Sequence, residues 1–250
     1  EIFKIYNNNI LQFLQTNQLN GSNDLNRVGK VIMQKKVDLL QLNSQTNQGS
    51  WTRYALDLKP LIDDDPKAIY QVRIGFKPEY STYLCGNEKE EETELSVVTN
   101  DTKEEIKSFW GNWYGINGYY ENYRWEHRSD PCQSAYYNYE NFVSRNVVSS
   151  NLGVIAKAGR DGSMLIAVTN LIDAQPINGA ALSFYDYQQQ LITTAQTDAS
   201  GMAKITLPRT PFAVIANHNA QTGYLKLQDG EALSMSRFNV AGANTQKGLK

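Results

Sequence analysis

The sequence predicts an all-β protein made of two tandem immunoglobulin-like antiparallel β-sandwiches. Apolar and polar residues alternate with period two in parts of the first half, which is typical of strands buried on one side. In the second half, short apolar segments recur roughly every ten residues with Gly- and Asp-containing turns between them, as in a sandwich. A chain of 250 residues has room for two such domains, which we place at residues 1–145 and 146–250.

The first strand is predicted at Ile2–Tyr6. The segment after it, Asn9–Leu14, is short and fits either a strand or a helical turn. Asn20-Gly21 is a turn signal, and after it Val28–Leu42 alternates apolar and charged residues in a strand-like way.

The clearest alternation occurs in Trp51–Leu58 and Ile69–Phe76. In the second of these, the apolar side chains point one way, and Gln71 and Arg73 point the other way. The run Asp63–Pro66 separates the two segments and is a strong breaker. This order predicts two strands, each buried on one side only, joined by a short connection.

An irregular excursion follows at about residues 86–142. Its first part, Gly86–Lys107, is acidic and poor in apolar residues, so we expect a solvated loop. Its second part, Phe109–Phe142, holds 12 of the 27 aromatic residues of the chain. This aromatic-rich segment either packs onto the first domain or forms a stacking surface for sugars or another protein. We favour packing. The residues of the possible interaction surface are Trp110, Trp113, Tyr119, Tyr120 and Trp125.

Eight short strands are predicted in the second half, separated by Gly- and Asp-containing turns. They are Leu152–Lys157, Met164–Asn170, Ala180–Tyr187, Leu191–Thr197, Met202–Leu207, Phe212–His218, Gly223–Leu227 and Leu233–Val240. The Cys…Trp…Cys signature is absent, so the domain is not a true immunoglobulin domain.

The two cysteines, Cys85 and Cys132, are either bridged to one another or are two buried thiols. Their polar, turn-like flanks favour a disulfide, and a disulfide indicates an oxidising compartment. With no Cys-x-x-Cys pair and only His127 and His218, the spacing assembles no zinc site.

No residue set points to catalysis, a cofactor or a metal, and we predict that the chain is not an enzyme. The sequence has no Gly-x-Ser-x-Gly elbow and no phosphate-binding glycine loop. Glu121 and Glu126 lie among aromatic residues like a glycosidase pair, but their spacing in sequence does not fix their separation in space. A net charge of −2 argues against nucleic acid as a partner, and no apolar run is long enough for membrane insertion.

The segments Arg145–Lys157, Pro176–Tyr187, Thr197–Ala203 and Gly223–Gly230 follow one another in this order in the second half of the chain. The first of them resembles the opening of a macroglobulin-type domain of bacterial alpha-2-macroglobulin-like proteins, and the others resemble later parts of that domain. Trp51–Leu58 and Ala68–Ile74 resemble the preceding macroglobulin domain of the same large proteins.

The resemblance implies two macroglobulin-type domains of a large protease inhibitor of the bacterial cell envelope, periplasmic or membrane-anchored. Their partners would be neighbouring domains and, through the full-length protein, proteases. The sequences after Cys85 and Cys132 do not match the thioester of this family, and no bait segment is assigned, so the implied role is a scaffold. The alternative is a carbohydrate-binding or adhesion module that uses the aromatic-rich segment.

Both ends of the chain read as cut. The sequence begins inside a predicted strand and ends without a terminal signal, so we expect a piece of a longer protein.

Overall fold

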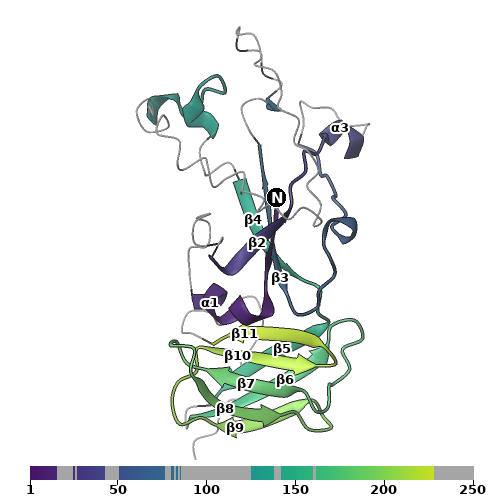
Figure 1. Ribbon diagram of the computed structural model, residues 1–250, viewed down its shortest axis with the longest axis vertical. Coiled ribbons are helices and arrows are strands. Elements are labelled where there is room, and N and C mark those ends of the chain that lie inside the picture. The colour runs from purple at the N-terminus through teal and green to yellow at the C-terminus, as the bar shows by residue number, and fades with distance from the viewer. Residues whose placement is uncertain are drawn as a thin grey trace, which may run out of the picture.

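The computed structural model describes residues 1–15, 25, 27–42, 51–76, 80, 81, 83, 85, 125–137, 142–159 and 162–227. Their strands form three antiparallel sheets, which confirms the all-β prediction (Figure 1). One sheet belongs to the N-terminal unit, which we define as the described residues up to Val148. The other two form the sandwich, defined as β5 to β11.

The sheet of the N-terminal unit has the strand order β2-β1-β3-β4. Its strands are β1 (Ile2–Ile5), β2 (Gly29–Met33), β3 (Ile69–Gly75) and β4 (Phe142–Val148). Short helices accompany it: η1 (Asn7–Asn9), α1 (Ile10–Gln15), α3 (Leu39–Leu42), η2 (Lys59–Leu61), η4 (Trp125–His127) and η5 (Ser134–Tyr137). The ambiguous segment after β1 is therefore helical, and the predicted strand Val28–Leu42 divides into β2 and α3.

β3 differs from the prediction because it is buried on both faces over Ile69–Arg73. It is a central strand that pairs with β1 on one side and β4 on the other. The guanidinium carbon of Arg73 lies 4.9 Å from the centre of the Phe3 ring, and Arg73 Nε donates to Gln71 Oε1 at 3.0 Å. These contacts allow two polar side chains to lie inside the protein.

The predicted strand Trp51–Leu58 is wrong, because the segment has no regular secondary structure. Its alternating burial is nevertheless present: Tyr54, Leu56 and Leu58 are half-buried, and the residues between them are exposed. Leu58 packs against the apolar cluster on one side of the sheet. An alternating pattern needs only one face against the core, and it does not establish that a neighbouring strand is available.

The sandwich has a four-stranded sheet of order β11-β10-β7-β8 and a three-stranded sheet of order β5-β6-β9. Its strands are β5 (Leu152–Ala158), β6 (Ser163–Asn170), β7 (Ala181–Tyr185), β8 (Leu191–Gln196), β9 (Met202–Thr206), β10 (Ala213–His218) and β11 (Gln221–Lys226). These elements confirm seven of the eight predicted segments, and the eighth, Leu233–Val240, lies outside the described residues.

The sandwich core lies between the two sheets and consists mainly of fully buried aliphatic residues with Phe184. The turn before β9 shows how local sequence determines the conformation of a connection between strands. Gly201 has a φ of +71°, and a Cβ there would lie 2.7 Å from the carbonyl oxygen of Val168 in β6. The Asp198 carboxylate accepts the backbone N–H groups of Ser200 at 2.8 Å and Met202 at 3.0 Å. The Ser200 hydroxyl also donates to this carboxylate at 2.6 Å, and this bond, followed by the backbone hydrogen bonds, lowers the pKa of Asp198.

Candidate functional site: the junction between the N-terminal unit and the sandwich

The junction places β1 and α1 of the N-terminal unit beside β10 and β11 of the sandwich (Figure 1). Ile215 of β10 and Tyr224 of β11 are direct neighbours across the strand pair, and both are partly buried. They pack against a buried apolar cluster of the N-terminal unit. The members of this junction cluster are Phe3, Ile5, Ile10, Phe13, Leu25, Val28, Val31 and Ile69. One apolar cluster therefore includes side chains from both parts of the chain.

Hydrogen bonds surround this cluster. The backbone N–H of Thr222 donates to the carbonyl oxygen of Pro66 at 3.0 Å. Gln189 Nε2 donates to Gln15 Oε1 at 2.6 Å, and Gln15 Nε2 donates to the carbonyl oxygen of Tyr187. These contacts connect residues more than 150 positions apart in the sequence, so the two parts of the chain meet through both apolar and polar groups.

A second group of contacts comes from the loop Asp63–Pro66, which we call the aspartate loop. The hydroxyl of Ser149, between β4 and β5, donates to the carboxylate of Asp64. Asp64 adopts a φ of +48°, a conformation that non-glycine residues adopt infrequently. Together with the Pro66–Thr222 hydrogen bond, this contact ties the aspartate loop to the linker and to β11.

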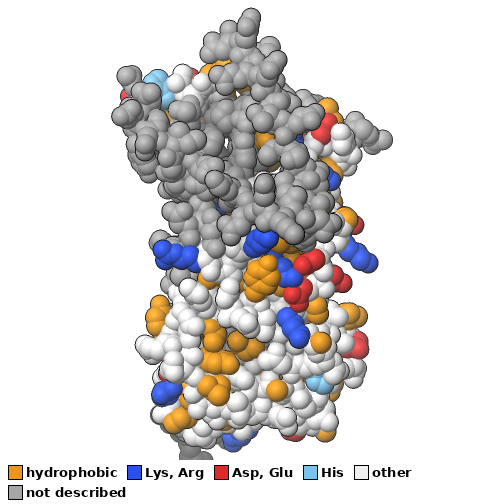
Figure 2. Space-filling model, viewed as in Figure 1, with side chains coloured by type: hydrophobic (Ala, Val, Ile, Leu, Met, Phe, Trp, Pro, Cys, Tyr) orange, Lys and Arg blue, Asp and Glu red, His pale blue; other side chains and the backbone are white. Residues whose placement is uncertain are grey.

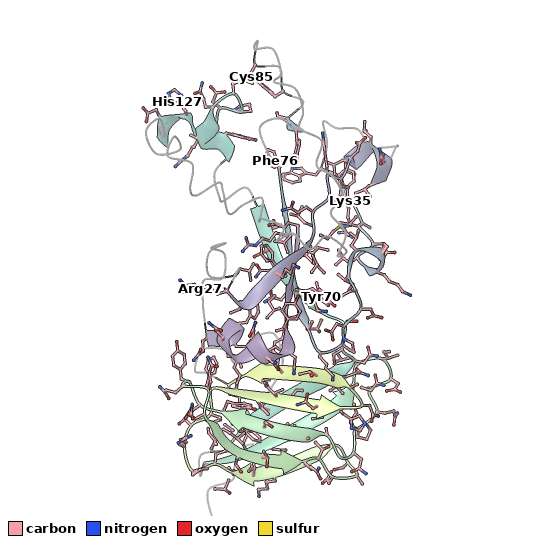
Figure 3. All side chains as sticks on the ribbon, in the orientation of Figure 1. Arg27, Lys35, Tyr70, Phe76, Cys85 and His127 are labelled. Atoms are coloured by element: carbon pink, nitrogen blue, oxygen red, sulfur yellow. A yellow bond between two sulfur atoms is a disulfide. The ribbon has the colours of Figure 1, made fainter. Side chains whose placement is uncertain are left out.

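The same loop is tied to the sheet by Lys4 of β1. Its ammonium lies 2.6 Å from Asp63 Oδ2 and 2.9 Å from Asp65 Oδ2. Tyr70 of β3, labelled in Figure 3, is fully buried; its hydroxyl donates to Asp63 and accepts the backbone N–H of Asp65 at 2.8 Å. Two strands of the sheet thus hold two carboxylates of the aspartate loop.

The charges in this group stabilise one another. Burial alone would lower the pKa of Lys4, but its hydrogen bonds to Asp63 and Asp65 outweigh burial and raise that pKa. Burial would raise the pKa of Asp65, yet the hydrogen bonds from Lys4 and from the backbone of Lys67 lower it. Burial and the bond to Asp63 raise the pKa of the Tyr70 hydroxyl. A buried ammonium is tolerated here because carboxylates pair with it.

Figure 2 shows basic and acidic side chains gathered at the level of the junction, above the sandwich, whose visible face is mostly uncharged. This arrangement is suited to holding two structural units together. Among the described residues there is no cluster of His, Cys, Asp and Glu that would hold a metal ion.

The structure bridges Cys85 and Cys132, with their Cα atoms 5.4 Å apart, as the sequence predicted. Trp110, Trp113, Tyr119 and Tyr120 of the predicted interaction surface lie outside the described residues.

Trp125 is placed only by its backbone, at the start of η4, and nothing is described of its side chain. The structure therefore provides no contact for the aromatic surface, which stays a prediction.

The sequence did not predict the group of contacts formed by Lys4, Asp63, Asp65 and Tyr70, which we call the Lys4 cluster. The run Asp63–Asp65 predicts a strand breaker, and its three successive carboxylates also provide partners for a buried cation. Lys4 lies in the register of a strand between the apolar residues Phe3 and Ile5. A single lysine inside a short apolar strand is a signal for such an ion pair.

Strands β5 to β11 form a two-sheet sandwich. Residues 149–245 match the family model of the bacterial alpha-2-macroglobulin MG3 domain. For these residues, the resemblance to bacterial alpha-2-macroglobulins inferred from the sequence is therefore confirmed.

Three solved structures of bacterial alpha-2-macroglobulins are also similar. The native Escherichia coli protein spanning domains NIE-MG1 is 22% identical, with 35% of this chain and 40% of that chain covered and a TM-score of 0.31. The cryo-EM structure of the native E. coli protein is 25% identical, with 41% of this chain and 6% of that chain covered and a TM-score of 0.35. A mutant of the Salmonella protein is 26% identical, with 40% of this chain and 6% of that chain covered and a TM-score of 0.34.

The chain thus spans less than half the length of each of these structures. The comparison with curated proteins gives no match. The assignment of the sandwich rests on the family model.

Proposed function

We propose that this chain is a scaffold segment of a large alpha-2-macroglobulin-like protease inhibitor, a protease trap of the bacterial cell envelope. In this proposal the two domains comprise residues 1–145 and 146–250, and they hold neighbouring domains of the parent protein in place. The observation that carries the proposal is the junction cluster, in which Ile215 and Tyr224 of the sandwich pack into the core of the N-terminal unit.

An interface of this kind favours a fixed arrangement over free movement. Interfaces between domains of one chain are usually polar, and relative motion is then the default expectation. Here fully buried residues, such as Phe3 and Ile5, lie directly under the sandwich contacts. Separating the two parts would expose this apolar surface to water at a cost of about 25 cal/mol per Å². The aspartate loop adds hydrogen bonds at the same place.

The proposed role is mechanical and not catalytic. Both cysteines of the chain are in the Cys85–Cys132 disulfide, so neither is available to form a thioester. We assign no bait segment. Proteases would therefore be met by the full-length protein, and the direct partners of this segment would be neighbouring domains.

The proposed location is extracytoplasmic, since a disulfide persists in an oxidising compartment. In the part of the chain that the structure describes, no helix has the length and apolar character needed to cross a membrane.

The experiment that tests the scaffold role is incubation of the 250-residue chain with trypsin-type and elastase-type proteases. We expect their activity on large protein substrates to be unchanged at a molar excess of the chain. Stoichiometric loss of activity on large substrates, with activity on small peptides retained, would mean that these residues do trap proteases, and it would contradict the scaffold role.

A further inference from the structure

The linker between the two parts of the chain is short, and each of its residues is hydrogen-bonded. Residues 149–151 connect the end of β4 to the start of β5, and the first of them is bonded to the aspartate loop. The backbone N–H of Asn151 donates to Gln221 Oε1 of β11 at 2.7 Å. The buried Ser150 hydroxyl donates to the same oxygen over a longer distance, 3.4 Å. One side-chain oxygen of the sandwich therefore binds two consecutive residues of the linker.

Other groups of the linker are also bound to the sandwich. The carbonyl oxygen of Asn151 accepts the backbone N–H of Leu171 at 2.8 Å, and the Ser150 hydroxyl accepts the backbone N–H of Leu152 at 3.1 Å. Two domains joined by a linker whose polar groups are open to water usually move relative to one another. In this linker the polar groups bind protein instead, so the chain leaves β4 in one direction.

A tight turn holds Gln221 in position. β10 and β11 pair as far as His218 and Gln221, which leaves the two-residue loop Asn219-Ala220. Both loop residues have positive φ, 47° and 64°, as a type I′ turn requires. Asparagine adopts this conformation readily, whereas alanine does so at a cost. Such conformations persist where the surrounding structure fixes them, so the position of Gln221 directly after the turn is well determined.

The residue after Gln221 binds the N-terminal unit. Thr222 is buried; its backbone N–H donates to the carbonyl oxygen of Pro66 at 3.0 Å, and its hydroxyl donates to Asn217 Oδ1 across the hairpin at 2.9 Å. Two consecutive residues of β11 thus bind the linker and the aspartate loop. The Ser149 hydroxyl joins the linker to the same loop. The hairpin, the linker and the aspartate loop therefore form a closed ring of contacts.

We propose that Gln221 is a clamp on the linker: by accepting the hydrogen bond of Asn151, it sets the direction in which the chain enters the sandwich, and with it the angle between the sandwich and the N-terminal unit. This inference rests on the proposed scaffold function and adds a positioning residue to it. The junction cluster consists of apolar contacts, which are not directional and allow one part to slide on the other. Hydrogen bonds are directional, so the clamp supplies the orientation that the apolar contacts lack.

The test compares two replacements of Gln221 in the full 250-residue chain. Gln221→Met keeps the length of the side chain but removes the oxygen, whereas Gln221→Glu keeps an oxygen that accepts hydrogen bonds. We expect hydrogen exchange at the Asn151 N–H, followed by NMR, to be slow in the unmodified chain, at least about tenfold faster in Gln221→Met, and slow again in Gln221→Glu. The matched control is Gln190→Met. The Gln190 amide donates to the carbonyl oxygen of Gln188 in the turn before β8, and its replacement should leave exchange at Asn151 unchanged.

Distances between spin labels report the angle between the two parts. The labels are placed at the exposed positions Lys30→Cys in β2 and Gln196→Cys in β8, with the native disulfide kept oxidised. We expect Gln221→Met to broaden or shift the distance distribution, and Gln221→Glu to leave it unchanged. Thermal melts establish that the variants are folded. Exchange at Asn151 in the unmodified chain tests the clamp even where Gln221→Met does not fold.

Four outcomes would each overturn the clamp. They are rapid exchange at Asn151 in the unmodified chain, a broad distance distribution in the unmodified chain, equal effects of Gln221→Met and Gln221→Glu, or faster exchange in Gln221→Met with an unchanged distance distribution. Trapping of proteases by the chain would contradict the proposed function and would leave the clamp unaffected, so the two failures are distinguishable.

Discussion

Replacing Lys4 with methionine removes the cation that holds the aspartate loop against the sheet. Loss of one partner of a fully buried ion pair costs about 3–5 kcal/mol, whereas an exposed pair is worth less than about 1 kcal/mol. The Lys4 side chain is 10% exposed, and those of Asp63 and Asp65 are 33% and 35% exposed, so the cluster lies between these limits. We expect Lys4→Met to lower the free energy of unfolding by about 2 kcal/mol.

The assay is thermal unfolding at pH 7 followed by circular dichroism, in which this loss corresponds to a decrease of about 4–8 °C in Tm. The matched control is Lys30→Met. Lys30 is the residue of β2 directly opposite Lys4, but it is exposed, and its replacement should change stability by less than about 0.5 kcal/mol. Equal melting temperatures for the two variants would refute the reasoning.

The same cluster predicts a dependence on pH. The pKa of Asp65 is lowered in the folded state, so its contribution is present above the pKa of the unfolded carboxyl and is lost as pH falls through the folded value. The pKa of Lys4 is raised, so its contribution is present below the ordinary lysine pKa and is lost as pH rises through the folded value. The stability difference between the unmodified chain and Lys4→Met should therefore be largest at neutral pH and decrease in acid.

Three further predictions concern other parts of the chain. Gly201→Ala should destabilise by at least about 1 kcal/mol more than Gly179→Ala, because both glycines have positive φ but only a Cβ at the first meets backbone; equal unfolding free energies would contradict this. Titration of the denatured, unreduced chain should find neither Cys85 nor Cys132 as a thiol, and two thiols would disprove the bridge. Trp125→Ala should lower the melting temperature without a change in binding to a glycan panel, and unchanged melting with lost glycan binding would favour a carbohydrate-binding module.

The strands of the sandwich could be predicted because their signals are local. Each strand has its own change from apolar to polar residues and its own turn, such as the turn with Asp198 and Gly201 before β9. Nothing outside the segment is needed to recognise a strand of this kind.

The N-terminal unit was harder to predict because its structure depends on which segments become neighbours. β3 is buried on both faces since it is a central strand, although its sequence reads as one-sided. β4, with its ladder to β3, was not predicted, because Phe142–Val148 follows an irregular stretch with no turn signal of its own. Trp51–Leu58 has the alternation of a strand but is not part of any sheet in the described structure.

The junction could not be read from the sequence for a related reason. Ile215 and Tyr224 point away from the sandwich core, and alternation alone assigns such positions to solvent. They are covered by the N-terminal unit, whose position depends on contacts such as that of Pro66 with Thr222. Tertiary placement of this kind leaves no periodic signal in the chain.

The central claim is that the junction holds the N-terminal unit and the sandwich in one arrangement. The most direct measurement is the distribution of distances between spin labels at Lys30→Cys in β2 and Gln196→Cys in β8, two exposed positions on opposite sides of the junction, with the native disulfide kept oxidised. We predict one narrow distribution, which broadens when Tyr224→Ala removes the largest sandwich side chain of the junction cluster. A broad distribution in the otherwise unmodified chain would contradict the claim.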